Sequence, residues 1–348
     1  MSNLLFQPLT LGDLTLSNRI IMAPLTRQRA GQERIPNDMM REYYTQRSTA
    51  GLILTEATSV DPMGVGYKDT PGIWNEEQVQ GWKKVTDGVH SKGGKIFLQL
   101  WHVGRISDPL FLNGKQPLAP SALAPKGHVS LVRPEKDYVV PRALETYEVK
   151  DIVQKYKQGA LNAKKAGFDG VEIHGANGYL IDQFLQSTTN LRTDEYGGIV
   201  QNRARFLLEI ADAVIEVWGA GRVGVHLAPA MDSHDMGDAN PKETFGYVAR
   251  ELGKRKIAFI FSREGQRENY LTGFLKKEFG GVMIANQGLS PEQAERLLKD
   301  GVADAVSWGK YFISNPDLPE KIRKGTALTA FEPQTFYSEG PKGYTDYL

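Results

Sequence analysis

The sequence predicts an α/β protein in which the whole chain folds as one closed (β/α)8 barrel. Short apolar strands alternate strictly with longer helical segments along the 348 residues, and eight of each can be counted. Strands separated by helices must pair in parallel, because a hairpin cannot join them. Eight parallel strands suit a closed barrel, which leaves no strand edge exposed.

Each predicted strand is a short apolar run that is followed by a segment with helical periodicity. The helix from Ser290 has the clearest start, because Ser290 can cap it, Pro291 suits its first position and Gln293 completes a capping box. The predicted strands are Arg19–Met22, Gly51–Thr55, Lys95–Leu100, Gly170–Ile173, Val223–Leu227, Ile257–Phe261, Gly281–Ala285 and Asp304–Ser307. The predicted helices are Asn37–Arg47, Glu76–Ser91, Glu148–Ala166, Arg203–Val217, Thr244–Arg255, Leu271–Phe279, Ser290–Lys299 and Leu318–Lys324.

A doubly wound open sheet is the alternative arrangement of parallel strands. That fold usually carries a glycine-rich nucleotide-binding turn after its first strand. Here the first strand runs into Ala23-Pro24-Leu25-Thr26, which contains no glycine. The turn therefore favours the barrel.

Composition and charge exclude several classes of partner. The chain has 42 Lys plus Arg against 41 Asp plus Glu and no basic stripe, so neither nucleic acid nor a membrane surface is expected as a partner. It has no cysteine, which excludes disulfides, thiolate metal sites and a cysteine nucleophile. Met1–Thr10 does not read as a signal peptide, and no apolar run approaches the roughly 18 to 20 residues of a membrane span. We expect a cytoplasmic enzyme that is a monomer or a homodimer.

Two predicted connections are much longer than the usual few residues. One runs from Trp101 to about Tyr147 and holds six prolines, and we expect it to form a lid or a small hairpin over the barrel mouth. The other runs from Gly175 to Asn202. Both follow strands, so both are predicted to lie at the carboxyl-terminal face, where barrel enzymes build their sites.

Polar and small side chains follow most of the predicted strands. The sharpest pair is His174 and Asn177, which stand three residues apart on a turn and can face the same way. An imidazole N–H and an amide N–H₂ aimed at one oxygen would stabilise negative charge developing on it. Tyr179 follows two residues later and has a proton to give. From the spacing alone, purely structural roles are equally possible: a histidine hydrogen-bonded within the protein, an asparagine that caps a helix and a tyrosine packed in the interior.

The loops after the seventh and eighth strands form the usual phosphate pocket of this fold. Gly288 and Gly309 allow close approach of the backbone, and Lys310 adds positive charge. The helix that starts near Ser290 points its amino terminus at the same region, which favours an anion. An ordinary turn with glycine at positive φ is the alternative interpretation.

One polar segment, MDSHDMGDAN, has the ligand types of a metal site. Its Asp232, His234, Asp235 and Asp238 are hard ligands. A solvated acidic loop is commoner than an unannounced metal site, so no metal is predicted.

Several motifs in this chain match one known family. The run HGANGYLIDQFLQSTTNLRTDEYGG at His174–Gly198 resembles the signature of the Old Yellow Enzyme family. The runs NRIIMAPLTR from Asn18, YYTQRSTAGLILTEAT from Tyr43, QLWHVGR from Gln99 and KGYTDY from Lys342 are similar to the same family. The resemblance covers nearly the whole chain in the right order. It implies an FMN-dependent ene-reductase that moves hydride from NADPH or NADH to an electron-poor alkene.

The resemblance also implies a role for each matching position. His174 and Asn177 match the pair that grips the activating oxygen of the substrate, and Tyr179 matches the proton donor. The aromatic residues that match the lining of the substrate space over the flavin are Tyr67, Trp101 and Tyr337. The positions that match flavin contacts are Pro24, Leu25 and Ala57 for the ring, Thr26 for its edge, Gln99 for the pyrimidine, and Gln287, Gly288, Gly309 and Lys310 for the phosphate loop.

Three positions depart from the family pattern. His226 stands where the family generally has an arginine beside the flavin N1 and O2, and Lys310 stands where it generally has a phosphate-binding arginine. Gln287 replaces a small residue. Because imidazole titrates near neutral pH, we hypothesise that His226 makes flavin reduction pH-dependent or weakens FMN retention.

The implied reaction has two steps of ping-pong type. Reduced nicotinamide reduces the flavin and leaves, and the alkene then takes its place with its carbonyl or nitro oxygen on His174 and Asn177. Nitroesters, nitroaromatics and quinones are expected as side substrates. Two alternatives stay open: a flavin-free barrel lyase acting on a phosphorylated substrate, and a flavin-binding barrel without turnover that acts as a sensor or interaction protein.

Overall fold

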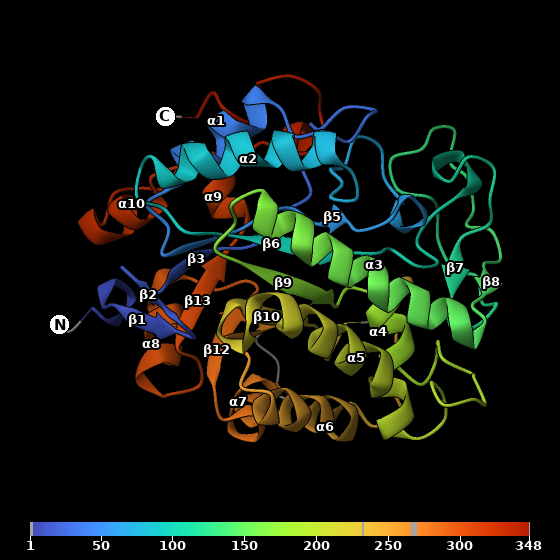
Figure 1. Cartoon of the computed structure of the whole chain (residues 1–348). Helices are drawn as coiled ribbons and strands as arrows, with labels where there is room; N and C mark the ends of the chain where they lie inside the picture. The colour runs from blue at the N-terminus through green and yellow to red at the C-terminus, as the bar shows by residue number, and fades with distance from the viewer. Residues whose placement is uncertain (1–2, 232, 266–269, 348) are drawn as a thin grey trace.

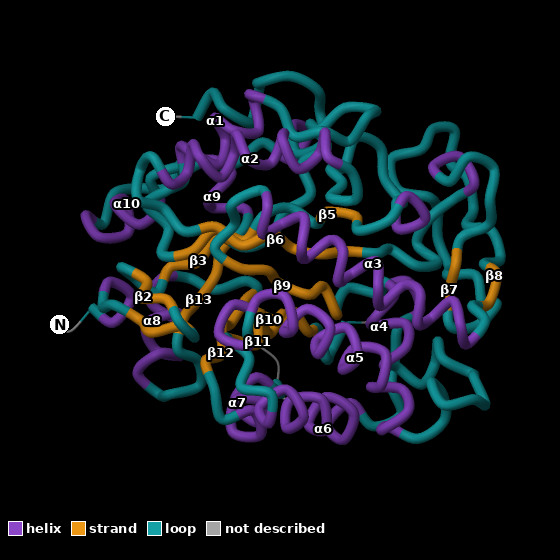
Figure 2. The backbone as a smooth tube through the Cα atoms, in the orientation of Figure 1, coloured by secondary structure: helices purple, strands orange, loops and turns teal. Residues whose placement is uncertain are grey.

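A computed structural model describes residues 3–231, 233–265 and 270–347. Within these residues, eight parallel strands form a ring in the order β4-β3-β13-β12-β11-β10-β9-β6, and the pairing of β4 with β6 closes it. Figures 1 and 2 show strands in the interior of the molecule. The ring strands are β3 (Ile20–Met22), β4 (Leu52–Leu54), β6 (Ile96–Trp101), β9 (Gly170–Gly175), β10 (Val223–Leu227), β11 (Phe259–Arg263), β12 (Val282–Asn286) and β13 (Ala305–Trp308). The predicted closed barrel is confirmed, and the open sheet is excluded.

Helices surround this ring of strands (Figure 2). The eight predicted helices are present as α1 (Asp38–Gln46), α2 (Glu76–His90), α3 (Thr146–Lys165), α5 (Val200–Trp218), α6 (Pro241–Lys254), α7 (Thr272–Phe279), α8 (Pro291–Lys299) and α10 (Leu318–Lys324). At α8, Ser290 and Gln293 form the predicted capping box. Among the described residues no helix is both long enough and apolar enough to cross a membrane.

Two short helices were missed by the sequence prediction. Helix α4 (Leu180–Leu185) follows β9, and helix α9 (Lys310–Ser314) follows β13. All six residues of α4 are buried, so its sequence has no amphipathic period that could reveal a helix. Each helix follows the end of its strand after a short turn, so both help to fix the loops that form the mouth of the barrel.

The opposite end of the barrel is covered by a hairpin that the sequence prediction also missed. Strands β1 (Leu9–Leu11) and β2 (Leu14–Leu16) pair antiparallel, and their leucines pack into one apolar cluster with side chains from inside the barrel. Gly224 lets Phe259 fill the interior, because a Cβ at this position would stand 2.1 Å from the ring. The hairpin and the packed interior close the floor, so the mouth is the open end.

The sixth strand lies two residues further along the chain than predicted. The prediction ended it at Phe261, whereas β11 runs to Arg263. Ser262 stays in the sheet because it pairs with Leu227 and Ala285, and its hydroxyl hydrogen-bonds Thr272 at 2.7 Å. The correction places Arg263 at the carboxyl end of a barrel strand.

The long connection between β6 and α3 lies beyond the carboxyl ends of β6 and β9 (Figure 1). It contains a two-residue parallel pairing of β7 (Leu118–Ala119) with β8 (Arg142–Ala143) and, between them, an antiparallel bridge of His128 with Asp137, which is the kind of pairing that the expected small hairpin needs. Its apolar residues Val129 and Tyr138 pack into the cluster that holds Trp101.

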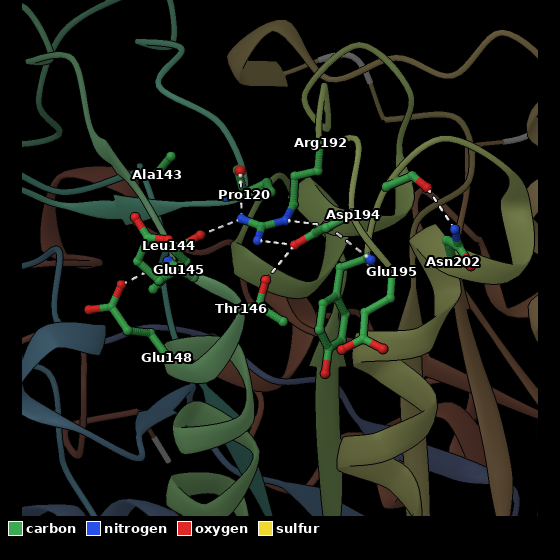
Figure 3. A network of polar contacts seen from close by, with 12 residues as sticks. Pro120, Ala143, Leu144, Glu145, Thr146, Glu148, Arg192, Asp194, Glu195 and Asn202 are labelled. Atoms are coloured by element: carbon green, nitrogen blue, oxygen red, sulfur yellow. Dashed lines mark hydrogen bonds and ion pairs between the residues drawn. The ribbon is translucent and has the colours of Figure 1, made fainter.

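A polar network holds this connection in place (Figure 3). At its centre Arg192, from the second long connection, donates to Asp194 at 2.9 Å and to the carbonyl oxygens of Pro120 and Leu144 at 3.1 and 2.5 Å. Asp194 also accepts from the hydroxyl of Thr146, the first residue of α3, at 2.8 Å. The two long connections are thereby tied together at the start of one helix.

Candidate active site

The carboxyl ends of the strands surround a cavity of about 730 Å³. The carboxyl-terminal segment of the chain adds Phe331, Phe336 and Tyr337 to its wall. The predicted site residues that line it are Pro24, Leu25, Thr26, Ala57, Gln99, His174, Asn177, Tyr179, His226, Gln287, Gly288, Gly309, Lys310 and Tyr337. These residues lie far apart in the sequence, and the closed barrel brings them to one mouth.

Tyr67 and Trp101 are the two predicted site residues that do not line the cavity. Trp101 is completely buried, and its ring meets that of Tyr179 edge-on at 5.0 Å. The hydroxyl of Tyr67 lies 2.8 Å from that of Tyr179. Both residues therefore support Tyr179 from behind, on the side where the long connection packs.

His174 points into the cavity as a neutral ring. Burial, followed by the charge of Arg263, lowers its pKa to about 3. Its Nδ1 is buried and has no partner among the described residues. The ring stacks on that of His226, with the centroids 5.2 Å apart and the planes 5° from parallel. A neutral imidazole can supply a hydrogen-bond donor without bringing a proton that titrates near neutral pH.

Asn177 stands in the left-handed conformation, with φ 61°, which asparagine tolerates better than most residues. Its Oδ1 accepts a hydrogen bond from Nη1 of Arg263 at 2.8 Å. A guanidinium has no acceptor, so this bond fixes which end of the amide is oxygen. The N–H₂ end is left to donate to a ligand.

Tyr179 is the third member of the predicted catalytic group. Burial is the main cause that raises its pKa to about 12, so the phenol keeps its proton at neutral pH. The structure thus brings an imidazole, an amide and one protonated phenol to the same cavity.

Gln99 connects a buried carboxyl group to His226. Its Nε2 donates to Glu172 at 2.7 Å and lies 3.2 Å from Nδ1 of His226. With Nδ1 as the acceptor, the proton of a neutral His226 ring sits on Nε2, which is buried without a partner among the described residues. Burial lowers the pKa of His226 well below its usual value. The ring is therefore neutral at neutral pH, and the hypothesis that its titration makes flavin reduction pH-dependent is not supported.

The opposite end of the cavity has the features of an anion site. Gly288 adopts φ 70°, and a Cβ added there would meet nothing within 4 Å, so its backbone is open to a ligand. Ser290 and Gln293, at the start of α8, line the same end. The ammonium of Lys310 lies 5.7 Å from the ring centre of Phe331 and forms no ion pair with a described carboxylate.

Arg263 is a cavity residue that sequence reasoning missed. It is partly buried, and the predicted strand stopped two residues before it. A prediction that extended the apolar run FIF by its period of two would have pointed residue 263 to the same side as Phe261.

The acidic loop does not form a metal site among the residues that the structure describes. Asp235 binds the backbone N–H and ammonium of Lys126, and Asp238 binds Arg203 and Thr244. Asp232 lies outside the described residues.

Comparisons with known proteins agree on one family. The sequence profile of the NADH:flavin oxidoreductase / NADH oxidase family matches residues 4–329. The structure of an old yellow enzyme homologue from Zymomonas mobilis superposes with a TM-score of 0.96 at 43% identity, covering 99% of both chains. The chain belongs to the Old Yellow Enzyme family.

Other members of the Old Yellow Enzyme family show the same likeness over the full length. Morphinone reductase in complex with tetrahydroNAD has a TM-score of 0.95 at 46% identity, covering 99% of this chain and 97% of that one. A probable flavin mononucleotide-dependent alkene reductase of Leishmania infantum is 41% identical over 354 residues, covering 99% of this chain and 97% of the relative. The chain is thus an NAD(P)H-dependent flavin oxidoreductase with FMN as its cofactor, and the flavin-free lyase is excluded.

The residues that line the cavity are chemically suited to bind FMN, the cofactor of an Old Yellow Enzyme. Three cations, Arg27, Arg263 and Lys310, line it, whereas no described acidic residue does. The unpartnered Nε2 of His226 offers a donor to a ring oxygen or nitrogen. Leu25 and the aromatic side chains supply apolar walls, and the open backbone at Gly288 suits a phosphate.

Proposed function

We propose that this protein reduces the activated C=C bond of α,β-unsaturated carbonyl or nitro compounds with electrons from NADPH or NADH. The observation that carries the proposal is the convergence of His174, Asn177 and Tyr179 on one cavity with the cofactor contacts. Two neutral donors beside a protonated phenol suit a substrate that gains negative charge at an oxygen and then needs a proton at carbon. A nitro group or a quinone offers the same kind of oxygen, so nitroesters, nitroaromatics and quinones are proposed as side substrates.

His174 and Asn177 hold and polarise the substrate in this proposal. When bound, FMN would supply the redox chemistry of hydride transfer between the nicotinamide and the alkene. The ring N–H of His174 and the amide N–H₂ of Asn177 donate to the carbonyl or nitro oxygen, which draws electrons away from the alkene. Arg263 fixes the amide of Asn177 in the donating orientation. Because both reactants use this one cavity, oxidised nicotinamide must leave before the alkene enters, which gives ping-pong kinetics.

Tyr179 delivers the proton that completes the reduction. Its hydroxyl gives a proton to the α-carbon, while hydride arrives at the β-carbon. The hydroxyl of Tyr67, 2.8 Å away, is placed to return a proton to the phenolate. The edge-on contact with Trp101 limits the ring of Tyr179 to one orientation.

A two-stage experiment on the purified protein tests this function. Under anaerobic conditions NADPH or NADH is expected to bleach the bound flavin, and 2-cyclohexenone, N-ethylmaleimide or a nitroester is then expected to restore its colour with formation of the saturated product. Bleaching that none of these acceptors reverses would instead support the alternative, a flavin-binding barrel that acts as a sensor or interaction protein. The initial rates with the two nicotinamides establish which of them is preferred.

The alkene step is expected to vary little with pH across the neutral range. His174 is neutral above its pKa of about 3, and Tyr179 keeps its proton below its pKa of about 12, so neither group changes charge between about pH 5 and about pH 9. Stopped-flow reoxidation of the reduced enzyme by 2-cyclohexenone measures this step alone. A bell-shaped profile centred near pH 7 that survives the substitutions Asp182→Asn and Glu172→Gln would contradict these charge states, because burial raises the pKa of those two carboxyl groups to about 7 and about 8.

A further inference from the structure

Arg263 is a partly buried cation, and the proposed mechanism assigns no negative charge to it. Its partners among the described residues are two neutral amide oxygens, Oδ1 of Asn177 at 2.8 Å and Oε1 of Gln287 at 3.0 Å. Burial lowers its pKa. Bringing a guanidinium into a partly buried site costs free energy that amide contacts recover only in part, so the site is suited to an anionic ligand.

The strand order places Arg263 along one edge of the flavin site. Gln99 on β6 marks the proposed pyrimidine end, and Lys310 after β13 marks the phosphate end. Going round the barrel between them, β10 carries His226 and the next strand, β11, carries Arg263. Arg263 thus stands between the two ends, two residues nearer the mouth than Phe261, which pairs with His226, and that histidine is neutral at neutral pH.

Backbone strain at Gln287 supports a function for this position of Arg263. Gln287 adopts φ 97°, a conformation that residues other than glycine rarely adopt, and its side chain holds Nε of Arg263. A strained backbone conformation of this kind costs of order 1–3 kcal/mol, and such strain is found mainly at functional sites. The bonds to Asn177 and Gln287 fix the guanidinium on two sides.

We propose that Arg263 supplies the positive charge that stabilises the reduced flavin ring, at the N1 and C2 carbonyl edge. Reduction by nicotinamide transfers a hydride, that is two electrons and one proton, so the ring becomes a monoanion unless it takes a second proton from water. A fixed guanidinium beside that edge favours the monoanion. At this edge of the ring the cation therefore stands on β11, whereas β10 provides only a neutral histidine donor. The inference rests on the proposed function, in which the reduced flavin passes its hydride to the alkene.

The test measures the two-electron midpoint potential of the holoenzyme against pH, for the wild type and for Arg263→Met. The variant is expected to lower the equilibrium constant for reduction at least tenfold, a shift of about 30 mV for a two-electron couple. Its potential should also fall more steeply with pH, because the reduced ring now takes up a second proton. A merely structural role for Arg263 would leave this pH slope unchanged.

Three further variants separate charge from packing. Arg263→Lys keeps the charge and should keep most of the potential, whereas Arg263→Met combined with His226→Arg returns a cation to β10 and should restore both potential and slope. Gln287→Gly removes the strain and frees the guanidinium, so the melting temperature should rise while the potential falls part of the way. Unchanged potential and slope in Arg263→Met would overturn the proposal.

A matched pair of acceptors identifies the rival role, recognition of a substrate carboxylate. If Arg263→Met leaves the potential unchanged and raises KM only for citraconate, with no change for 2-methylmaleimide, the cation serves the substrate and the proposal is wrong. A wild-type protein whose reduced flavin no alkene acceptor reoxidises would instead refute the proposed function itself. Anaerobic reoxidation of the wild type by 2-cyclohexenone distinguishes these two failures, because it needs no measurement on Arg263→Met.

Discussion

Replacing Tyr179 with phenylalanine is expected to slow alkene reduction by about 100- to 10,000-fold, the usual contribution of a positioned general acid. The phenol carries its proton at neutral pH because burial raises its pKa to about 12. The substitution removes only the hydroxyl, so the ring can still pack against Trp101. Reduction of the flavin by nicotinamide needs no proton from this residue, and its rate should stay within a few-fold of the wild type.

Separate stopped-flow measurements of the two half-reactions decide this prediction. Tyr147→Phe, on the exposed surface of α3, is the matched control and should leave both rates unchanged. Equal losses in both half-reactions of Tyr179→Phe would show that the residue shapes the cavity rather than donates the proton. Tyr67→Phe should have a smaller effect, because it removes only the 2.8 Å partner of the donor.

A second large effect is expected on stability, from Arg47→Met. Arg47 is completely buried and donates to the carbonyl oxygens of Tyr43, Phe312 and Ile313 at 2.7–2.8 Å. It also reaches the carbonyl of Tyr344 in the carboxyl-terminal segment, at 3.4 Å. Hydrogen bonds to charged groups contribute about 1.5–3 kcal/mol each, and unpaired buried carbonyls add a penalty, so we expect a loss of roughly 3–6 kcal/mol.

Urea unfolding measures this loss. Arg41→Met is the matched control, because Arg41 lies on the same helix region but is half-exposed and forms only a 3.6 Å ion pair with Asp38. The control should change the free energy of unfolding by less than about 1 kcal/mol. Because the carboxyl-terminal segment also carries Phe336 and Tyr337 to the cavity wall, Arg47→Met should raise KM as well. Equal unfolding free energies for the two variants would refute the assigned role of Arg47.

The barrel could be predicted from the sequence because its determinants are local. The apolar run Val223–Leu227 predicts a strand, and the amphipathic pattern of α8 predicts a helix. Parallel pairing then follows from the alternation of strands and helices. The β1–β2 hairpin and α4 were missed because three-residue strands and a helix buried on all sides carry no periodic pattern. Such short elements need tertiary packing to be stable.

The candidate site was predictable to the extent that it follows a contiguous motif. His174, Asn177 and Tyr179 belong to one run, and the structure brings them to one cavity. Arg263 was missed because the predicted strand ended two residues too early, so that residue 263 was not expected at the mouth. The charge of His226 could not be judged from its residue type, because burial sets its pKa.

The leucine hairpin under the barrel has a consequence for how reactants reach the cavity. The floor of the barrel is closed by Leu9, Leu11, Leu14 and Leu16. Every reactant that moves between the flavin site and bulk water therefore has to pass through the mouth. An alkene that binds at this opening while the flavin is still oxidised is then a dead-end inhibitor, because it prevents the nicotinamide from entering. High alkene concentrations should consequently suppress turnover by competing with the electron donor for the oxidised enzyme.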